Sequence, residues 1–269
     1  MHHYLKYFCP GDLTNPVYGR FFFACCSLLA YRKNNMSEKY FRQAGFESIN
    51  LMDVNGAQCY LLANKTTAVI AVRGTESHQR NDLWADIKTW KRKSRTEGQV
   101  HAGFKGETEK LWNGVAGFIK QNKDKDLYIA GHSLGGAIAT ITASRIKTNN
   151  LKMVYTYGSP RVGNKTWVEH LRFHHQRMQN NNDAVTQTPL MILGYRHFCP
   201  PVYINHYGNI RKLTRWQKIK DMFRGRWAAL KKFSFFDGIY DHSMDKYCSK
   251  LHKIWEDTAY VYRDLRNGK

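Results

Sequence analysis

The feature that most constrains this chain is the segment Gly131–Gly136 (GHSLGG), which contains the pattern G-x-S-x-G. Two contrasting stretches flank it. Leu127–Ala130 is short and apolar, as a buried strand is, and Ala137–Ala143 is rich in small residues, as a closely packed helix is. Strand, turn and helix in this order are the context in which the pattern presents a serine above a sheet. The segment therefore predicts an α/β fold with a serine at the carboxyl end of a strand.

The chemistry of such a turn explains its residues. The chain must reverse so sharply that Ser133 is held in a strained backbone conformation, and glycines at 131 and 135 remove side chains that would collide there. The following helix directs its amino-terminal dipole and N–H groups toward any anion formed at the serine, with the N–H of Leu134 as the first donor. A glycine-rich turn with a capping serine is the alternative, which the two flanks disfavour.

The rest of the chain alternates between strand and helix patterns. It contains no repeat, low-complexity segment or Pro/Gly/Ser-rich linker, so residues 1–269 are expected to form a single domain. The alternation predicts a mostly parallel central sheet with helices on both faces. Strands are expected at 58–62, 67–72, 127–130 and 153–157, and helices at 16–32, 107–121 and 134–147.

The charge balance is strongly basic. There are 42 Lys and Arg against 21 Asp and Glu, for a formal net charge of +21. This excess predicts attraction to an anionic partner such as phospholipid headgroups. No signature of a nucleic-acid-binding module accompanies it, so nucleic acid is not the expected partner.

The side chains that could bind metal or form bridges have no productive spacing. None of the six cysteines forms a C-x-x-C pair, so neither a zinc site nor a disulfide framework is predicted. His170 and His174 are spaced as two ligands on one helix face, but no Glu accompanies them as a metalloprotease motif requires. The sequence predicts a protein that needs no metal or organic cofactor.

Beyond the serine turn, several motifs resemble those of the class 3 lipases, which include the fungal triacylglycerol lipases and many bacterial relatives. They occur in the order of the family and cover roughly residues 50–255. The segments that carry the resemblance are Ala71–Thr75 (AVRGT), Val100–Phe104 (VHAGF), Tyr155–Gly163 (YTYGSPRVG), Asn180–Val185 (NNNDAV) and Asp241–Tyr247 (DHSMDKY).

The resemblance implies the α/β-hydrolase fold and a catalytic triad of Ser133, Asp183 and His242. In such a triad the histidine takes the serine proton and the carboxylate orients the histidine. The resemblance also implies that Thr75 joins Leu134 in the oxyanion hole. Among the 12 histidines, the alternatives to His242 are His101, His197 and His206.

Two further segments bear on lipid contact. By resemblance, residues 76–95 form a lid over the site, with an apolar stripe that ends in basic residues. A basic insert at about 211–232 has Trp, Ile, Phe and Leu at helical spacing among Lys and Arg, and it is closer to bacterial members of the family than to the compact fungal loop. Each is either an ordinary surface element or a contact with an anionic lipid surface.

The implied activity is that of a serine carboxylic ester hydrolase acting on lipid acyl esters through an acyl-enzyme. Triacylglycerol or partial glycerides are the expected substrates, and phospholipid cleaved at the sn-1 position or short soluble esters are the alternatives. A catalytically inert protein that binds anionic membranes is the alternative outside the enzymes, and an intact Ser133, Asp183 and His242 argue against it.

The apolar run Phe21–Ala30 (FFFACCSLLA) bears on location. As the core of a secretory signal it would have a long lead-in, and no small-x-small cleavage pattern follows it. It is too short to span a bilayer as a helix. It is therefore predicted to be the first helix of the domain, and a cytoplasmic or peripheral membrane location is favoured over secretion.

Overall fold

Successive side chains of strand β3 (Thr67–Val72) point into two different apolar clusters in the computed structural model. Val69 and Ala71 belong to one cluster, whereas Ala68, Ile70 and Val72 belong to the other. All of them are buried, because both faces of the strand are covered. Side chains alternate across a strand with a period of two, so a continuous apolar run such as this one belongs in a three-layer fold.

The structure describes residues 3–74, 90–211, 214, 216, 217, 220 and 241–266. The helices of this part are α1 (Pro16–Leu29), α2 (Asn34–Gln43), α4 (Ala102–Gln121), α5 (Leu134–Ser144), α6 (Lys165–Glu169) and α9 (Met244–Arg266), with 3-10 turns η1 (His3–Tyr7), η3 (Ala184–Gln187) and η4 (Met191–Leu193). The strands are β1 (Ser48–Val54), β2 (Ala57–Ala63), β3 (Thr67–Val72), β4 (Lys91–Lys93), β5 (Gln99–His101), β6 (Asp126–His132), β7 (Leu151–Tyr157), β8 (Gly163–Asn164), β9 (His175–Asn180), β10 (Tyr195–Arg196) and β11 (Pro201–Ile204).

The central sheet has the strand order β1-β2-β3-β6-β7-β9-β11. Strands β1, β2 and β3 are antiparallel neighbours, and every pairing from β3 to β11 is parallel. A second, antiparallel sheet of four short strands has the order β10-β8-β5-β4. Parallel strands end at the same edge of a sheet, so the loops after β6, β7 and β9 lie close together.

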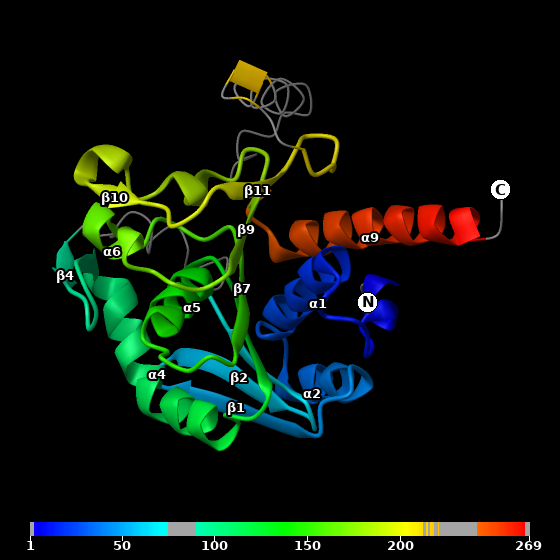
Figure 1. Ribbon diagram of the computed structural model, residues 1–269, viewed down its shortest axis with the longest axis horizontal. Helices are drawn as coiled ribbons and strands as arrows, with labels where there is room; N and C mark the ends of the chain where they lie inside the picture. The colour runs from blue at the N-terminus through cyan, green and yellow to red at the C-terminus, as the bar shows by residue number, and fades with distance from the viewer. Residues whose placement is uncertain are drawn as a thin grey trace.

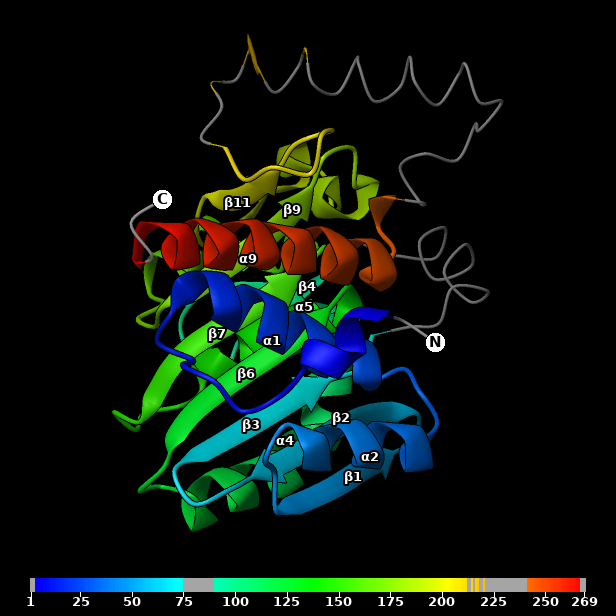
Figure 2. The ribbon, with the colours of Figure 1, turned by 90° about the vertical axis from the view of Figure 1, so that its right-hand side faces the viewer.

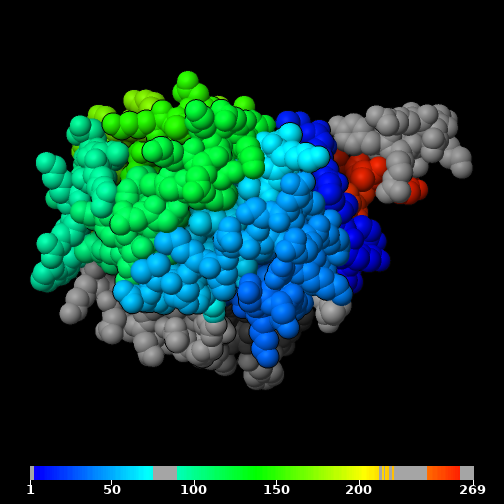
Figure 3. Space-filling model, turned by 90° about the horizontal axis from the view of Figure 1, so that it is seen from below, coloured from blue at the N-terminus to red at the C-terminus, as the bar shows by residue number. Residues whose placement is uncertain are grey.

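Helices cover both faces of the central sheet (Figure 1). Helices α1 and α9 lie side by side across one face (Figure 2), where the rings of Phe21 and Trp255 stack with centroids 5.5 Å apart. Helices α4 and α5 pack on the opposite face. From below, residues of β1, β2 and α2 in blue adjoin the green residues of α4 (Figure 3).

The predicted fold class is confirmed, and the boundaries of three predicted helices shift. Helix α1 begins at Pro16 as expected, because the side chain of Asn15 accepts from the amides of Val17 and Tyr18. Helix α4 begins at Ala102, earlier than predicted, because the Nδ1 atom of His101 accepts from the amide of Phe104 at 3.3 Å. Helix α1 ends at Leu29 rather than 32, and α5 at Ser144 rather than 147.

Several predicted regions lie outside the described residues. These are most of the expected lid, whose described part is an exposed Trp90 followed by strand β4, and nearly all of the basic insert. The helices of the described part include none with the length and apolarity needed to cross a membrane.

Candidate active site

Ser133 lies between β6 and α5 in a conformation that non-glycine residues seldom adopt. Its φ is 59° and its ψ is −128°. Such a backbone costs on the order of 1–3 kcal/mol and persists only where the surroundings impose it. Here the amide of Ser133 donates to the carbonyl of Tyr157 on the neighbouring strand at 3.0 Å, and the first turn of α5 follows immediately. The turn is therefore fixed by the sheet on one side and by a helix on the other.

The glycines of the motif are required by close backbone approach. A Cβ atom at Gly131 would overlap the carbonyl oxygen of Gly135, and one at Gly135 would overlap the carbonyl oxygen of Val72. The Oγ atom of Ser133 is buried and has no hydrogen-bond partner within the described part of the chain. Leu134 is the first residue of α5, where an N–H has no acceptor in its own helix. A buried hydroxyl thus lies beside a backbone donor.

His242 and Asp183 form a buried pair although they are far apart in the sequence. The Nδ1 atom of His242 lies 2.9 Å from Oδ1 and 3.0 Å from Oδ2 of Asp183. The carboxylate also accepts from the amide of Val185 at 3.0 Å and from the hydroxyl of Tyr247 at 2.6 Å. Asp183 follows β9 and His242 precedes α9, so the pair links the end of β9 to the start of α9.

The loop after β7 brings this pair to the serine turn. Gly158 follows Tyr157, whose carbonyl binds the amide of Ser133, and has a φ of 58°. A Cβ atom there would lie 2.6 Å from Oδ2 of Asp183 and 2.7 Å from Nδ1 of His242. The loop therefore has the serine turn on one side and the histidine–carboxylate pair on the other.

His132, immediately before the serine, fixes the backbone of His242. Its Nε2 atom lies 2.7 Å from the carbonyl oxygen of His242, and its Nδ1 atom lies 2.9 Å from the hydroxyl of Tyr31. The two imidazole rings are 4.6 Å apart between centroids. The position of the His242 imidazole therefore depends on His132, the residue that precedes Ser133.

Sequence reasoning missed the roles of Tyr31, His132 and Tyr247. His132 and Tyr247 stand within quoted motifs, but the motifs alone do not say which atoms they contact. No sequence pattern around Tyr31 indicates a role, since its hydrogen-bond partner, His132, lies in a distant strand. Burial, and then the Asp183 carboxylate, raise the pKa of Tyr247 well above its ordinary value, so its hydroxyl remains a donor to that carboxylate.

The other histidines considered from the sequence have different partners. His101 caps α4, and the Nε2 atom of His197 lies 2.8 Å from the carbonyl of Thr186. His206 packs against the ring of Tyr207. No group of three His, Cys, Asp or Glu side chains within the described ranges could hold a metal ion. Thr75 lies outside the described residues, although Gly74 before it abuts the turn: a Cβ atom there would lie 3.2 Å from Cβ of Ser133.

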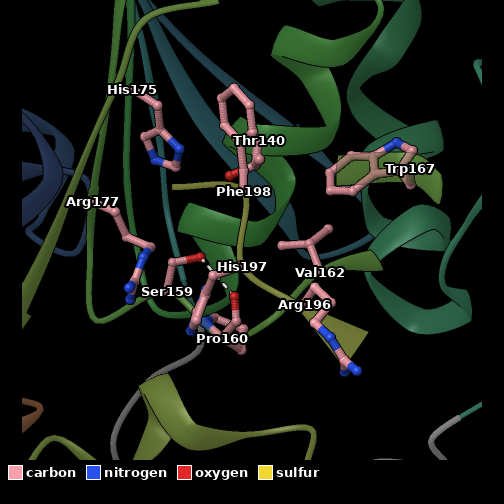
Figure 4. A pocket seen from close by; sticks show the side chains of 10 residues that line it. All are labelled: Thr140, Ser159, Pro160, Val162, Trp167, His175, Arg177, Arg196, His197 and Phe198. Atoms are coloured by element: carbon pink, nitrogen blue, oxygen red, sulfur yellow. Dashed lines mark hydrogen bonds between the residues drawn. The ribbon is translucent and has the colours of Figure 1, made fainter. Parts of the chain in front are cut away.

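A separate cavity of about 10 Å³ is lined in part by Ser159 and Pro160 of the loop after β7 (Figure 4). That volume suits one water molecule, so the cavity cannot accept an acyl chain. Burial, and then the charge of Arg177, lower the pKa of His175 to about 3, and the same two causes lower the pKa of His197. The residues that line the cavity are Thr140, Ser159, Pro160, Val162, Trp167, His175, Arg177, Arg196, His197 and Phe198.

Solved structures share this architecture. The triacylglyceride lipase of Rhizomucor miehei superposes with a TM-score of 0.65 at 17% identity, over 84% of this chain and 92% of that one. Lipase II from Rhizopus niveus superposes with a TM-score of 0.60 at 22% identity, over 71% and 81% of the two chains. At such identities the likeness establishes the fold alone, and the protein has the α/β-hydrolase fold.

Sequence comparison adds a likeness over the middle of the chain. Residues 69–193 match the model of the family described as Lipase (class 3). This part of the chain is therefore similar to the class 3 lipases.

Named relatives are similar over part of the chain. A secreted mono- and diacylglycerol lipase of Fusarium solani is 34% identical over 39% of this chain and 34% of its own length. One of Penicillium cyclopium is 33% identical over 38% of this chain and 35% of its own length. The matched region thus spans about a third of these relatives.

The expectation of a cytoplasmic or peripheral membrane location is wrong on this comparison. The relatives from Fusarium, Penicillium and Malassezia are named as secreted. The expectation depended on reading Phe21–Ala30 as a core helix. That assignment is correct, since the segment is the buried part of α1, but a helix packed in the core carries no information about export.

Proposed function

We propose that this protein is a serine carboxylic ester hydrolase that cleaves lipid acyl esters through an acyl-enzyme. The observation that carries the proposal is the strained, buried Ser133 at the start of α5, next to the loop that contacts the His242–Asp183 pair. A backbone strained at one serine and a buried imidazole bound to a carboxylate are costly to maintain without a chemical use.

The roles follow from the chemistry of each group. The imidazole of His242 takes the proton as the oxygen of Ser133 attacks the ester carbonyl, and it returns that proton to the departing alcohol. Asp183 holds the imidazole with Nδ1 toward the carboxylate and stabilises its protonated form. The N–H of Leu134, together with Thr75, would bind the oxyanion. Water then attacks the acyl-enzyme with the same histidine as base.

The proposed substrates are partial glycerides. Relatives that match part of the chain are named as mono- and diacylglycerol lipases. Hydrolysis of monoacyl-, diacyl- and triacylglycerols and of phospholipids, each at several chain lengths, would separate this substrate class from the alternatives. Phospholipids cleaved faster than every glyceride would replace the proposed substrate class with a phospholipase one.

Ser133→Ala tests the reaction. We expect kcat for p-nitrophenyl esters to fall by about 10⁴-fold or more, because removal of the nucleophile disables the whole triad. The matched control is Ser144→Ala at the other end of α5, where the hydroxyl only donates to the carbonyl of Ile141. Equal rates for wild type and Ser133→Ala would exclude Ser133 as the nucleophile, and no hydrolysis by either protein would leave an inert binding protein as the better description.

A further inference from the structure

The residues from Leu190 to Leu193 form an apolar turn that faces solvent. Their exposed fractions are 57%, 52%, 88% and 41% for Leu190, Met191, Ile192 and Leu193. Four consecutive large apolar residues exposed together are unlike the scattered apolar residues of an ordinary surface, and such a patch marks a contact with another molecule or with a membrane.

The backbone of this turn is tied to the body of the protein, so its side chains are held outward. The carbonyl of Leu193 accepts from Nζ of Lys91 at 2.6 Å, and the carbonyl of Met191 accepts from the guanidinium of Arg196 at 2.7 Å. The amide of Gly194 also donates to the carbonyl of Met191 at 2.9 Å. With these carbonyls satisfied internally, entering an apolar layer would not strip them of hydrogen bonds to water.

Positive charge surrounds the turn, and negative charge is absent from its sequence neighbourhood. No Asp or Glu occurs in the sequence from 184 to 220. The segment 90–96 (WKRKSRT), which Lys91 links to the turn, carries Lys91, Arg92, Lys93 and Arg95 without an acid. It begins with Trp90, which is 69% exposed. Apolar residues and Trp flanked by Lys and Arg are typical of a surface that enters the interface of an anionic membrane.

The turn is also attached to the edge of the sheet that carries the candidate active site. It follows Asp183 through η3, and the carbonyl of Thr188 accepts from the amide of Arg161 at 2.7 Å. Arg161 belongs to the same loop as Gly158, which contacts the His242–Asp183 pair. The turn then leads into β10 (Figure 1). A membrane bound at this turn would therefore lie on the side of the molecule where the strands of the serine and the acid end.

We propose that Leu190–Leu193 is a fixed anchor that enters an anionic phospholipid surface, with Trp90 beside it and Arg92 and Lys93 binding headgroup phosphates. The proposal rests on the proposed function, because the anchor would deliver Ser133 to esters at a lipid interface. It assigns membrane contact to a surface formed by the described residues 90–93 and 190–193.

The test measures partition of full-length protein onto vesicles by flotation. Ser133→Ala is the parent, so that lipid is not consumed, and the vesicles are phosphatidylcholine alone or mixed with phosphatidylglycerol. Adding Ile192→Asp should lower partition onto the mixed vesicles by about tenfold or more, because a charge replaces the most exposed apolar side chain of the anchor. Adding Leu51→Asp, at an exposed apolar residue on the edge strand β1, should leave partition unchanged.

A second variant separates the headgroup contribution. Arg92→Gln with Lys93→Gln should weaken partition onto the phosphatidylglycerol vesicles and reduce its dependence on salt, with little effect on pure phosphatidylcholine. Equal partition of the Ile192→Asp and Leu51→Asp proteins would overturn the anchor. The anchor would also be overturned if light scattering showed that Ile192→Asp abolishes self-association and leaves vesicle binding intact. The apolar turn would then bind a second copy of the protein and not a membrane.

Hydrolysis of a water-soluble p-nitrophenyl ester by the protein with Ser133 intact is measured in parallel. Vesicle binding that depends on Ile192, together with no ester hydrolysis, would refute the proposed function and support the anchor. Hydrolysis that depends on Ser133, with binding indifferent to Ile192, would end the anchor and leave the proposed function standing.

Discussion

Gly158 has no side chain, and this leaves the room that the side chains of Asp183 and His242 occupy. A Cβ atom there would meet both Asp183 and His242 within 2.8 Å. Gly158→Ala should therefore displace the pair and lower kcat for a soluble ester on the order of 10²-fold, the usual penalty for a misplacement near 1 Å. Steady-state kinetics on p-nitrophenyl esters measures this.

The matched control is Gly56→Ala. Gly56 has a φ of 83° and nothing within 4 Å of its Cβ position, so it shares the unfavourable backbone without the collision. Gly56→Ala should lose about 1–2 kcal/mol of unfolding free energy from the backbone conformation alone, and Gly158→Ala should lose more because of its collision. If Gly56→Ala lost as much activity as Gly158→Ala, backbone strain rather than contact with the pair would explain the effect.

Tyr247 should act as a positioning residue for Asp183. Tyr247→Phe removes the hydroxyl that donates to the carboxylate at 2.6 Å and accepts from the amide of Asn180 at 2.9 Å. We expect kcat to fall about tenfold with KM unchanged, since the lost hydrogen bond to a charged group contributes about 1.5–3 kcal/mol. The control is Tyr157→Phe, whose buried hydroxyl donates to the carbonyl of Arg20 at 2.6 Å. Equal losses of kcat in the two variants would refute a specific role.

The sequence motifs identified Ser133, Asp183 and His242 as candidates, and the structure brings the last two into hydrogen-bonding contact. Ser133 could be identified from the strand and helix patterns that flank it, whereas Asp183 and His242 were candidates only through the resemblance to the class 3 lipases. Contacts such as Tyr31 with His132 could not be predicted, because they depend on where a helix crosses a strand far along the chain.

At the scale of elements, strands buried on both faces were predictable and edge elements were not. β3 matches its predicted range of 67–72, and β6 and β7 contain theirs, because these strands are continuous apolar runs. β1, β11 and the second sheet were missed, since their strands are short or half-exposed and pair with partners that local sequence does not reveal. The interior strand β9 was missed as well, because its sequence HQRMQN is mostly polar.

The pairing of α1 with α9 links the core to the candidate active site, because α9 carries Tyr247. Phe21 is fully buried and stacks on Trp255 across this pair. Phe21→Ala should lower the unfolding free energy by about 3–5 kcal/mol through the cavity it leaves, as urea titration would measure. Tyr207→Ala, at an exposed aromatic residue, should change it by less than about 0.5 kcal/mol. Similar losses in both would show that α1 and α9 do not pack as described.

At the scale of the whole molecule, buried histidines and the basic charge together set the response to acid. The folded protein keeps His175 neutral to about pH 3, whereas an unfolded histidine takes up a proton near pH 6.5. Below that value the unfolded chain binds more protons, so the unfolding free energy falls as the pH falls from about 6.5 toward 3, and above 6.5 this source contributes no slope. His197 acts in the same direction.

Repulsion within a chain of net charge +21 also grows as acidic side chains are neutralised. The pH dependence of the unfolding free energy of wild type alone therefore does not isolate the contribution of the histidines. His175→Gln can, because the variant has one fewer group to protonate on unfolding. Urea midpoints at pH 7 and pH 5 should differ less for His175→Gln than for wild type, while His174→Gln, at an exposed neighbour, should keep the wild-type difference. Charge repulsion is common to all three proteins, so an unchanged difference in His175→Gln would assign the acid sensitivity to net charge instead of to the imidazole beside the cavity.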